Sequence, residues 1–447
     1  VVGITVTPTA GLVSTEVGGT ATFDVVLDSE PTADVTIPVA TDDASEGTAD
    51  VTSLTFTAAN WNLPQTVTVT GADDFVQDGN AAFSIVLGPA TSTDVLYDAF
   101  DANDVLVTNT DDDVAGITVT PTAGLVSTEA GGTATFDVVL DSQPTADVTI
   151  PVSTGDATEG SADVASLTFT SANWNAPQTV TVTGTNDFVQ DGDAAYSIVL
   201  GAASSADLLY DTMDATDVAV SNTDDDVVGI TVTPTAGLVS TEAGGTATFE
   251  VVLDTEPTAD VTIPVSTSNG VEGSADVTSL TFTTTNWNLA QTITVTGGDD
   301  FIQDGDTEFS IVLGAATSTD LLYDAFDAND VFVTNTDDDV VGITVTPAAT
   351  CVTTEAGGTM TFDVVLNSQP VAPVTVPVSS SNTAEATLDA VSLTFTAADW
   401  NTPQTVTVTG ADDLMQDGNA GYSIVIGAAT SSDPLYDGFD AADFAAV

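Results

Sequence analysis

The chain is built from four copies of one sequence unit that recur every 113 residues. Each copy opens with Gly-Ile-Thr-Val-Thr-Pro, whose first residues are Gly3, Gly116, Gly229 and Gly342. One tryptophan per copy follows the same spacing, at Trp61, Trp174, Trp287 and Trp400. Such a unit is long enough to form its own core, since domains commonly contain roughly 100–200 residues. We therefore predict four tandem domains, at residues 1–113, 114–226, 227–339 and 340–447.

Within the first copy, short β-branched segments alternate with turn residues, which is typical of strands. The segment Thr66-Val-Thr-Val-Thr70 alternates apolar and polar side chains, as a strand with one buried face does. Glycine and proline interrupt the segments. We predict seven strands per copy, in the first at roughly 3–8, 20–27, 34–40, 53–57, 65–70, 81–87 and 104–109. The pattern predicts an all-β fold of four tandem immunoglobulin-like, seven-stranded β-sandwiches in a linear array.

The charge of the chain is extreme. Its 447 residues include 67 acidic side chains and no Lys, Arg or His, which gives a formal net charge of −67. Hydrophobic residues make up 42% of the chain and mean hydropathy is +0.24. Disordered acidic chains lack such apolar content, so this chain is expected to fold. Its charge has to be compensated by salt or by metal ions, because no side chain supplies a cation.

The absence of Lys and Arg also excludes classes of partner. Nucleic acids and anionic membrane surfaces are bound through basic side chains, so neither is expected as a direct partner. No stretch approaches the ~18 apolar residues of a membrane span. The first residues already resemble a strand and the last copy stops inside one, so we expect a processed chain or a piece of a longer array. Cys351 stands where the other copies have leucine and is interpreted as a small apolar residue.

The acidic residues of each copy fall in loops that a sandwich brings to one end. Because strands run from end to end, the first, third and fifth loops converge with the end of the last strand. We expect this end to be the one from which the chain enters the next copy. The candidate metal ligands of the first copy are Glu16, Glu46, Asp50, Asp73, Asp74, Asp78, Asp111, Asp112 and Asp113.

The other copies carry acids at matching positions. In the second copy these are Glu129, Glu159, Asp163, Asp187, Asp191, Asp224, Asp225 and Asp226. In the third they are Glu242, Glu272, Asp276, Asp299, Asp300, Asp304, Asp337, Asp338 and Asp339. In the fourth they are Glu355, Glu385, Asp389, Asp412, Asp413 and Asp417. Acids elsewhere drift between copies: Asp42 is replaced by Gly155, Ser268 and Ser381.

Three adjacent aspartates close the first three copies. Two unit charges ~5 Å apart repel by roughly 1 kcal/mol in water, and no basic side chain relieves this repulsion. Ligands that are all oxygen suit Ca²⁺, and Mg²⁺ less well because it demands stricter geometry. The alternative interpretation is that these acids are solvated loop residues that confer solubility. Asp98 and Asp101 are also kept in every copy, and either a second ion site or turn chemistry would explain them.

The unit resembles the Calx-β family of Ca²⁺-binding sandwich modules, found in sodium–calcium exchangers and in large bacterial surface proteins. The likeness is best in the third copy, in the segment from Asp299 to Phe309 and in the closing run Asp337-Asp338-Asp339. Glu242 matches the early glutamate of the family, and Glu272 or Asp276 its mid-domain acid. The resemblance implies a calcium-binding sandwich in every copy. Departures are Asp304 where the family has Glu, Asn186 at the first loop position of copy two, and a fourth copy without its closing run.

The aromatic residues have simpler interpretations. The four tryptophans lie in loops at the opposite end, where we expect them to shield the core; a sugar-stacking platform is the alternative. The tyrosines of the long loops are expected to anchor those loops, at Tyr97, Tyr210, Tyr323 and Tyr436.

These features predict a structural protein rather than an enzyme, because His, Lys, Arg and a usable Cys are missing. We expect an extracellular adhesin, surface fibre or filament: a rod of repeats stiffened by Ca²⁺ at the junctions, with neighbouring repeats and other copies of the chain as partners. Edge strands without lysine could pair between chains. The alternative is an array of polysaccharide-binding modules on a secreted or surface protein, and a regulatory Ca²⁺ sensor is a third interpretation.

Overall fold

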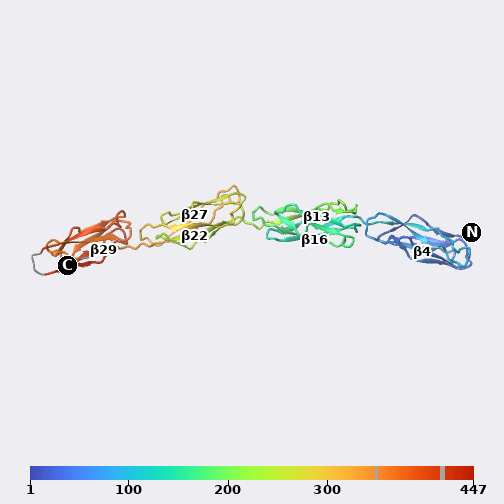
Figure 1. The fold of residues 1–447 in the computed structure, drawn as a ribbon, viewed down its shortest axis with the longest axis horizontal. Coiled ribbons are helices and arrows are strands. Elements are labelled where there is room, and N and C mark those ends of the chain that lie inside the picture. The colour runs from blue at the N-terminus through green and yellow to red at the C-terminus, as the bar shows by residue number, and fades with distance from the viewer. Residues whose placement is uncertain (348–350, 413–417) are drawn as a thin grey trace. The chain divides into compact units, whose positions relative to one another are not determined.

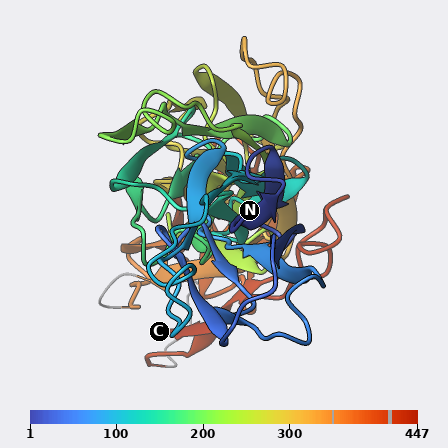
Figure 2. The same cartoon turned by 90° about the vertical axis from the view of Figure 1, so that its right-hand side faces the viewer.

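The structure, a computed structural model, describes residues 1–347, 351–412 and 418–447 (Figure 1). In these residues all the elements of regular secondary structure are β-strands, so the fold is all-β. The strands of the first repeat, blue in Figure 2, face the viewer there as flat ribbons. They are β1 (Ile4–Thr7), β2 (Leu12–Thr15), β3 (Thr20–Leu27), β4 (Val35–Thr41), β5 (Gly47–Ala49), β6 (Ser53–Phe56), β7 (Gln65–Gly71), β8 (Ala81–Leu87) and β9 (Val105–Thr110).

The later repeats follow the same order. The second contains β10 (Ile117–Thr120), β11 (Leu125–Thr128), β12 (Thr133–Leu140), β13 (Val148–Thr154), β14 (Gly160–Ala162), β15 (Ser166–Phe169), β16 (Gln178–Gly184), β17 (Ala194–Leu200), β18 (Ser204–Ser205) and β19 (Val218–Thr223). The third contains β20 (Ile230–Thr233), β21 (Leu238–Thr241), β22 (Thr246–Leu253), β23 (Val261–Thr267), β24 (Gly273–Ala275), β25 (Ser279–Phe282), β26 (Gln291–Gly297), β27 (Thr307–Leu313) and β28 (Val331–Thr336). The fourth contains β29 (Ile343–Pro347), β30 (Thr359–Leu366), β31 (Val374–Ser380), β32 (Ala386–Leu388), β33 (Ser392–Phe395), β34 (Gln404–Gly410), β35 (Tyr422–Ile426) and β36 (Phe444–Ala446).

Each of the first three repeats forms two sheets. In the first repeat the strand orders are β1-β3-β7-β5 and β2-β9-β8-β4-β6. All neighbouring strands are antiparallel except β2 and β9, which run parallel with Leu12 opposite Val107. This is the arrangement of an immunoglobulin-like sandwich. The seven predicted strands are all present.

Strands β2 and β5 are additional to the prediction. Each is short and next to glycine, so its sequence resembles a loop, and only pairing with a distant strand makes it regular. Both matter for the acidic end of the repeat, because β2 leads directly to Glu16 and β5 begins directly after Glu46.

The core lies between the two sheets and follows from alternation along the strands. In β3, Phe23, Val25 and Leu27 are buried while Thr22 and Asp24 between them are exposed. They pack with Ile85 of β8 from the opposite sheet. The described residues form four such core clusters, and each draws its side chains from a single repeat.

The chain divides into two compact units, Val1–Asp187 with Asp191–Asp225, and Phe188–Gln190 with Asp226–Val447. Each unit contains two of the core clusters. The four domain boundaries at 113-residue intervals stay a prediction. No helix in the described part of the chain has the length and apolar character needed to cross a membrane.

Candidate metal centre

Four strands deliver acidic side chains to one end of the first sandwich. Glu16 follows β2, and its backbone N–H donates to the Thr110 carbonyl oxygen at the end of β9 (3.1 Å). Glu46 precedes β5, and its carbonyl oxygen accepts the N–H of Ala72 just after β7 (3.1 Å). The two glutamates, the loop after β7 and the residues after β9 therefore meet. The convergence predicted from strand parity is present in the structure.

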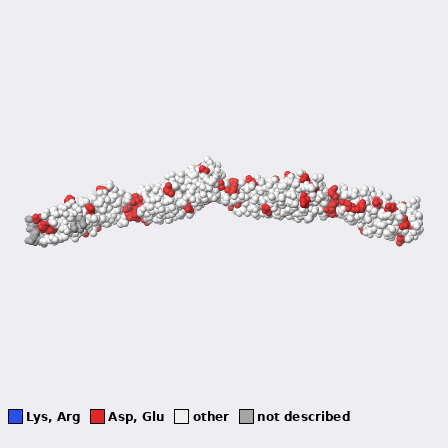
Figure 3. All heavy atoms as spheres, in the orientation of Figure 1, with Lys and Arg blue, Asp and Glu red and all other residues white. Residues whose placement is uncertain are grey.

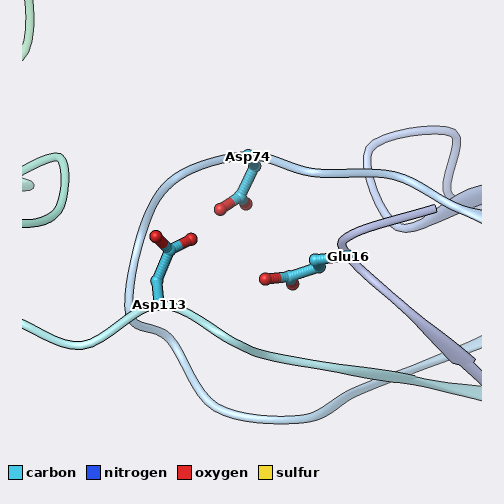
Figure 4. A group of neighbouring side chains, drawn as sticks. All are labelled: Glu16, Asp74 and Asp113. Atoms are coloured by element: carbon cyan, nitrogen blue, oxygen red, sulfur yellow. The ribbon is translucent and has the colours of Figure 1, made fainter. Parts of the chain in front are cut away.

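The first cluster consists of Glu16, Asp74 and Asp113. One carboxylate oxygen of each lies within 4.8 Å of the others, and all three side chains point toward a common space (Figure 4). The third repeat repeats this cluster with Glu242, Asp300 and Asp339. Three converging carboxylates at this spacing can coordinate one cation.

A second cluster lies beside the first and consists of Glu46, Asp74 and Asp78. Its counterpart in the second repeat is Glu159, Asp187 and Asp191. Asp74 belongs to both clusters of the first repeat, so the two clusters share one carboxylate. Figure 3 shows the same tendency over the chain: acidic atoms gather in patches on the face in view.

The glutamates of these clusters are buried. Glu16 and Glu242 are each 3% exposed and Glu46 is 9% exposed. Among the described residues no hydrogen-bond partner reaches Oε2 of these three glutamates, or Oδ2 of Asp113 and Asp339. A buried carboxylate oxygen without a partner is costly, so this donor set fits a bound cation, which would satisfy these oxygens.

Burial and mutual repulsion shift the titration of these groups. Burial, followed by repulsion from Asp111 and Asp74, raises the pKa of Glu16 from 4.5 to about 7. The pKa of Glu242 rises to about 7, through burial and then Asp300 and Asp337. Burial and Asp299 raise the pKa of Asp339 from 3.8 to about 6. Such shifts mark carboxylates that a folded chain holds close together without a counter-charge.

Hydrogen bonds fix the loop after β7, residues 72–80. Asp74 Oδ1 accepts the N–H of Val76 (2.9 Å), and Asp73 Oδ1 accepts the N–H of Phe75 (3.2 Å). Asp111 Oδ2 accepts the N–H of Gly79 (2.7 Å) and its Oδ1 that of Asp113 (2.8 Å). Asp73 and Asp111 therefore shape the site from outside the two clusters, and Asp111 ties the loop to the end of β9.

The strands also pack tightly beneath the site. A Cβ on Gly71 would meet the side-chain oxygen of Asn109 and the carbonyl oxygen of Thr15. Gly184 and Gly297 have the same surroundings in their repeats. Only glycine allows β7 to approach β2 and β9 this closely.

Asp50 does not join these clusters, in contrast to the prediction. Its side chain is exposed, and its Oδ1 accepts the backbone N–H of Thr68 in β7 (2.9 Å). The same bond joins Asp163 to Thr181, Asp276 to Thr294 and Asp389 to Thr407. These aspartates extend the pairing of the short strand that precedes them, which explains why every copy keeps them.

The remaining predicted residues differ in burial and in their hydrogen bonds. Asp112, Asp225 and Asp338 are exposed, and Asp226 is half-buried. Asp224 and Asp337 repeat the role of Asp111, accepting the N–H groups of Gly192 and Gly305. Glu129 is 4% exposed and Glu272 is 6% exposed. Asp299 accepts the N–H of Phe301, and Asp304 has its pKa raised by burial and by Asp300.

The fourth repeat differs. Glu355 is exposed, whereas its counterparts Glu16 and Glu242 are buried. Glu385 is half-buried and Asp412 is exposed, while Asp413 and Asp417 lie outside the described residues. The sequence ends at Val447, which corresponds to Thr108, so positions matching Asp111–Asp113 lie outside it. The described part of this repeat therefore shows only a partial set of ligands.

Sequence reasoning missed two residues that organise the site. Asn109 is fully buried at the end of β9; its Oδ1 accepts the Ser14 hydroxyl (3.0 Å) and its Nδ2 donates to the Ala72 carbonyl oxygen (3.0 Å). In the third repeat the equivalent Asn335 also donates to Glu272 Oε2 (3.4 Å). Gln77 Oε1 accepts the N–H of Ala115, beyond the closing aspartates (2.6 Å). Asn109 recurs as Asn222 and Asn335, and Gln77 recurs as Gln190, Gln303 and Gln416, which was the available signal.

The long loop before β9 follows turn chemistry. Asp98 Oδ1 accepts the N–H of Ser92 (3.3 Å), which favours turn chemistry over a second ion site for this residue. The neighbouring Asp94 is 5% exposed and accepts the N–H groups of Thr32 (2.7 Å) and Leu96 (3.0 Å). The Tyr97 hydroxyl, buried beside them, donates to the Ser29 carbonyl oxygen (2.7 Å). The tyrosine is a loop anchor, as predicted.

Comparison with protein-family models gives no match, and no curated protein matches the chain. Several solved structures are similar in part. CBD12 from CALX1.2 is 15% identical, with 48% of this chain and 98% of that chain covered and a TM-score of 0.26. The calcium binding domain CBD12 of CALX1.1 is 16% identical, with 49% and 99% covered and a TM-score of 0.27. The E. coli chaperone DraB is 9% identical, with 49% and 98% covered and a TM-score of 0.20. At such scores the assignment of the sandwich fold rests on the strand order itself.

Proposed function

We propose that this chain is a structural repeat protein of the cell exterior whose sandwiches bind Ca²⁺ at their acidic ends, in the manner of Calx-β modules. The observation that carries the proposal is the burial of two equivalent glutamates, Glu16 in the first repeat and Glu242 in the third. Each belongs to a cluster with two aspartates and has a carboxylate oxygen without a hydrogen-bond partner in the described chain. The chain contains no basic side chain to neutralise them.

The donor set supports Ca²⁺ over other ions. All ligands are oxygens on loops, and Ca²⁺ accepts six to eight such ligands in variable geometry, whereas Mg²⁺ requires a near-ideal octahedron. Zinc, copper and iron sites commonly use nitrogen or sulfur ligands, and the sequence has no His and one Cys. Glu16, Glu46, Asp74, Asp78 and Asp113 would hold the ions in the first repeat.

A structural role fits the repetition better than catalysis. Near-identical sites recur at a fixed period, and the sequence has no His, Lys or Arg to act together with their carboxylates. Ions at the acidic ends would neutralise repulsion within and between repeats and would stiffen an adhesin, fibre or filament. Millimolar Ca²⁺ outside cells would keep weak sites filled. Further repeats of a longer chain and other copies of this chain, joined through edge strands, are the proposed partners.

The polysaccharide-binding alternative gains no support from the tryptophans. Trp61, Trp174, Trp287 and Trp400 each pack against the core of their own repeat. Three of them also contact a phenylalanine from the preceding repeat. These contacts occupy ring surface on which a sugar would stack.

Calorimetric titration of the chelator-treated full chain with CaCl₂ and with MgCl₂ tests the proposal. We expect Ca²⁺ to bind at more than one site per chain and more tightly than Mg²⁺. A variant in which Glu16, Glu129 and Glu242 are all replaced by Gln should lose the sites that contain these glutamates and should bind fewer Ca²⁺ ions per chain. The variant Glu30→Gln is the matched control, because Glu30 is exposed at the other end and Gln143 and Gln369 stand at its place in other copies. Equal binding by both variants would contradict the proposal.

A further inference from the structure

The loop that supplies Asp74 and Asp78 also carries a projecting aromatic residue, Phe75. Its backbone has φ 66°, the left-handed region that non-glycine residues rarely occupy, and its side chain is 49% exposed. The two carboxylates that precede Phe75 hold this conformation: Asp73 accepts the N–H of Phe75 and Asp74 that of Val76. The metal-binding loop is thereby shaped to present a ring outward.

The ring of Phe75 lies against the next repeat. Its centroid is 6.0 Å from that of Trp174, with an interplanar angle of 41°. The carbonyl oxygen of Phe75 accepts the N–H of Gln143 in the same repeat as Trp174 (2.7 Å). Gln77 of the loop receives the N–H of Ala115 in the connecting segment (2.6 Å). We call these three contacts the latch.

The latch recurs with the same geometry. Phe188 lies 5.9 Å from Trp287, and Phe301 lies 6.1 Å from Trp400. Their carbonyl oxygens accept the N–H groups of Glu256 (2.7 Å) and Gln369 (2.6 Å). The linker contact recurs too, from Val228 to Gln190 and from Val341 to Gln303, both at 2.6 Å. Such repetition indicates a built contact rather than a chance approach.

The surface that receives the phenylalanine is held by its own repeat. Trp174 packs against the core cluster of the second sandwich, and its carbonyl oxygen accepts the N–H of Leu140 in β12 (3.1 Å). A ring presented by the preceding loop therefore meets a fixed partner. Tilted aromatic pairs at this separation stabilise a contact by about 0.5–1.5 kcal/mol beyond burial.

We infer that the latch couples metal occupancy of one repeat to docking on the next, so that the acidic loop is the surface by which each of the first three repeats recognises the tryptophan end of another repeat. The inference rests on the proposed metal site. Asp74, which belongs to both clusters, is the residue before Phe75, and Asp78 lies three residues after it. A cation that fixes these carboxylates fixes the ring between them. Without the cation, repulsion among Asp74, Asp78 and Asp111 acts on the same loop.

Coupling of this kind is reciprocal. If Ca²⁺ favours the docked latch, the latch must raise the Ca²⁺ affinity of its own loop by the same factor. Loss of the ring should therefore weaken Ca²⁺ binding, although Phe75 contributes no ligand atom. Couplings of this type commonly amount to about 5–150-fold in affinity.

The test uses the full chain with Trp61, Trp287 and Trp400 changed to Phe, so that Trp174 is the only tryptophan. Two versions are compared, one with Phe75 and one with Phe75→Asn. Asparagine tolerates the left-handed backbone but offers no aromatic ring. Acrylamide quenching of Trp174 is measured with chelator and with Ca²⁺. With Phe75 we expect Ca²⁺ to reduce the quenching, and with Phe75→Asn we expect no change.

Affinity is measured by calorimetry in the same chains, with Glu129, Glu242 and Glu355 changed to Gln so that the first repeat keeps the most complete site. We expect Phe75→Asn to bind Ca²⁺ at least about 5-fold more weakly. Equal affinity, together with quenching that responds equally to Ca²⁺ in both versions, would overturn the coupling and leave the metal site standing. Failure of the Phe75 version to bind Ca²⁺ at all would overturn the metal site as well.

Discussion

The Glu16 backbone N–H donates a 3.1 Å hydrogen bond to the Thr110 carbonyl oxygen. This bond continues the parallel pairing of β2 with β9 by one residue, and so it brings Glu16 level with Asp111–Asp113. Residues almost one hundred positions apart in sequence thus share one site. The predictions below follow from the burial and the bonds of this end of the sandwich.

Replacing Glu16 with Gln should have opposite effects with and without Ca²⁺. In chelator at about pH 8, the change removes a buried charge whose pKa is raised to about 7, so the free energy of unfolding should rise by on the order of 1–3 kcal/mol. With Ca²⁺ the variant loses a ligand and should be less stable than the wild type. Thermal unfolding in both conditions measures this, with Glu30→Gln as the control that changes neither. The same sign in both conditions would argue against a metal at Glu16.

The metal-free chain should lose stability as the pH rises. Glu16 and Glu242 have pKa values of about 7 in the folded chain, against an ordinary value of 4.5. Between these values the folded chain holds protons that the unfolded chain has released. Their contribution to stability is therefore full below about pH 4.5 and is lost as the pH rises through about 7. Melting temperatures in chelator across this range check the sign, and replacing both glutamates with Gln should flatten the profile.

The stabilisation of the chain by Ca²⁺ should have the opposite pH dependence and increase as the pH rises. Ca²⁺ binds carboxylates only after they lose their protons, so its affinity should increase over the same pH window. The increase in melting temperature caused by Ca²⁺ should be small at about pH 5 and largest near pH 8. Paired scans with Ca²⁺ and with chelator at each pH measure this difference. A difference that shrinks with rising pH would contradict carboxylate ligands.

Asp50→Ala should lower stability without weakening Ca²⁺ binding. Its Oδ1 accepts the N–H of Thr68 and lies outside the clusters of the first repeat. Loss of this hydrogen bond should cost about 1 kcal/mol. Chemical denaturation and Ca²⁺ titration of the same variant separate the two effects. A large loss of Ca²⁺ affinity would restore Asp50 to the ligand set first predicted for it.

Gly71→Ala should disrupt the site through packing alone. The added methyl group would meet the Asn109 side chain and the Thr15 carbonyl oxygen, and the latter is backbone that cannot rotate away. We expect a loss of about 1–3 kcal/mol in stability, as for other overpacked sites. Gly88→Ala is the control, because its Cβ would only reach ordinary contact with Pro38. Equal stability of the two variants would show that β7 can move away from β2 and β9.

Much of this end of the molecule follows from local sequence. Alternation in segments such as Thr66–Thr70 predicts the strands, and strand parity then places Glu16, Asp74 and Asp113 together. The errors arise where a distant partner decides. Asp50 is an acid in the predicted loop, yet its carboxylate accepts the N–H of Thr68, which lies 18 residues further along the chain. Strand β2 exists only because β9 pairs with it. The contact of Phe75 with Trp174 joins two copies, so no pattern within one copy reveals it.

The parallel pairing of β2 with β9 has a mechanical consequence. The chain passes from β1 into the start of β2 and leaves the repeat past the end of β9, and these are opposite ends of the same strand pair. Tension applied through the neighbouring repeats would pull the two strands lengthwise past each other. All the hydrogen bonds between them would then bear load together, instead of opening one after another as in a zipper. Glu16 and Asp113 lie just beyond this pair, so a cation between them would fasten the two strands at the point where sliding must begin.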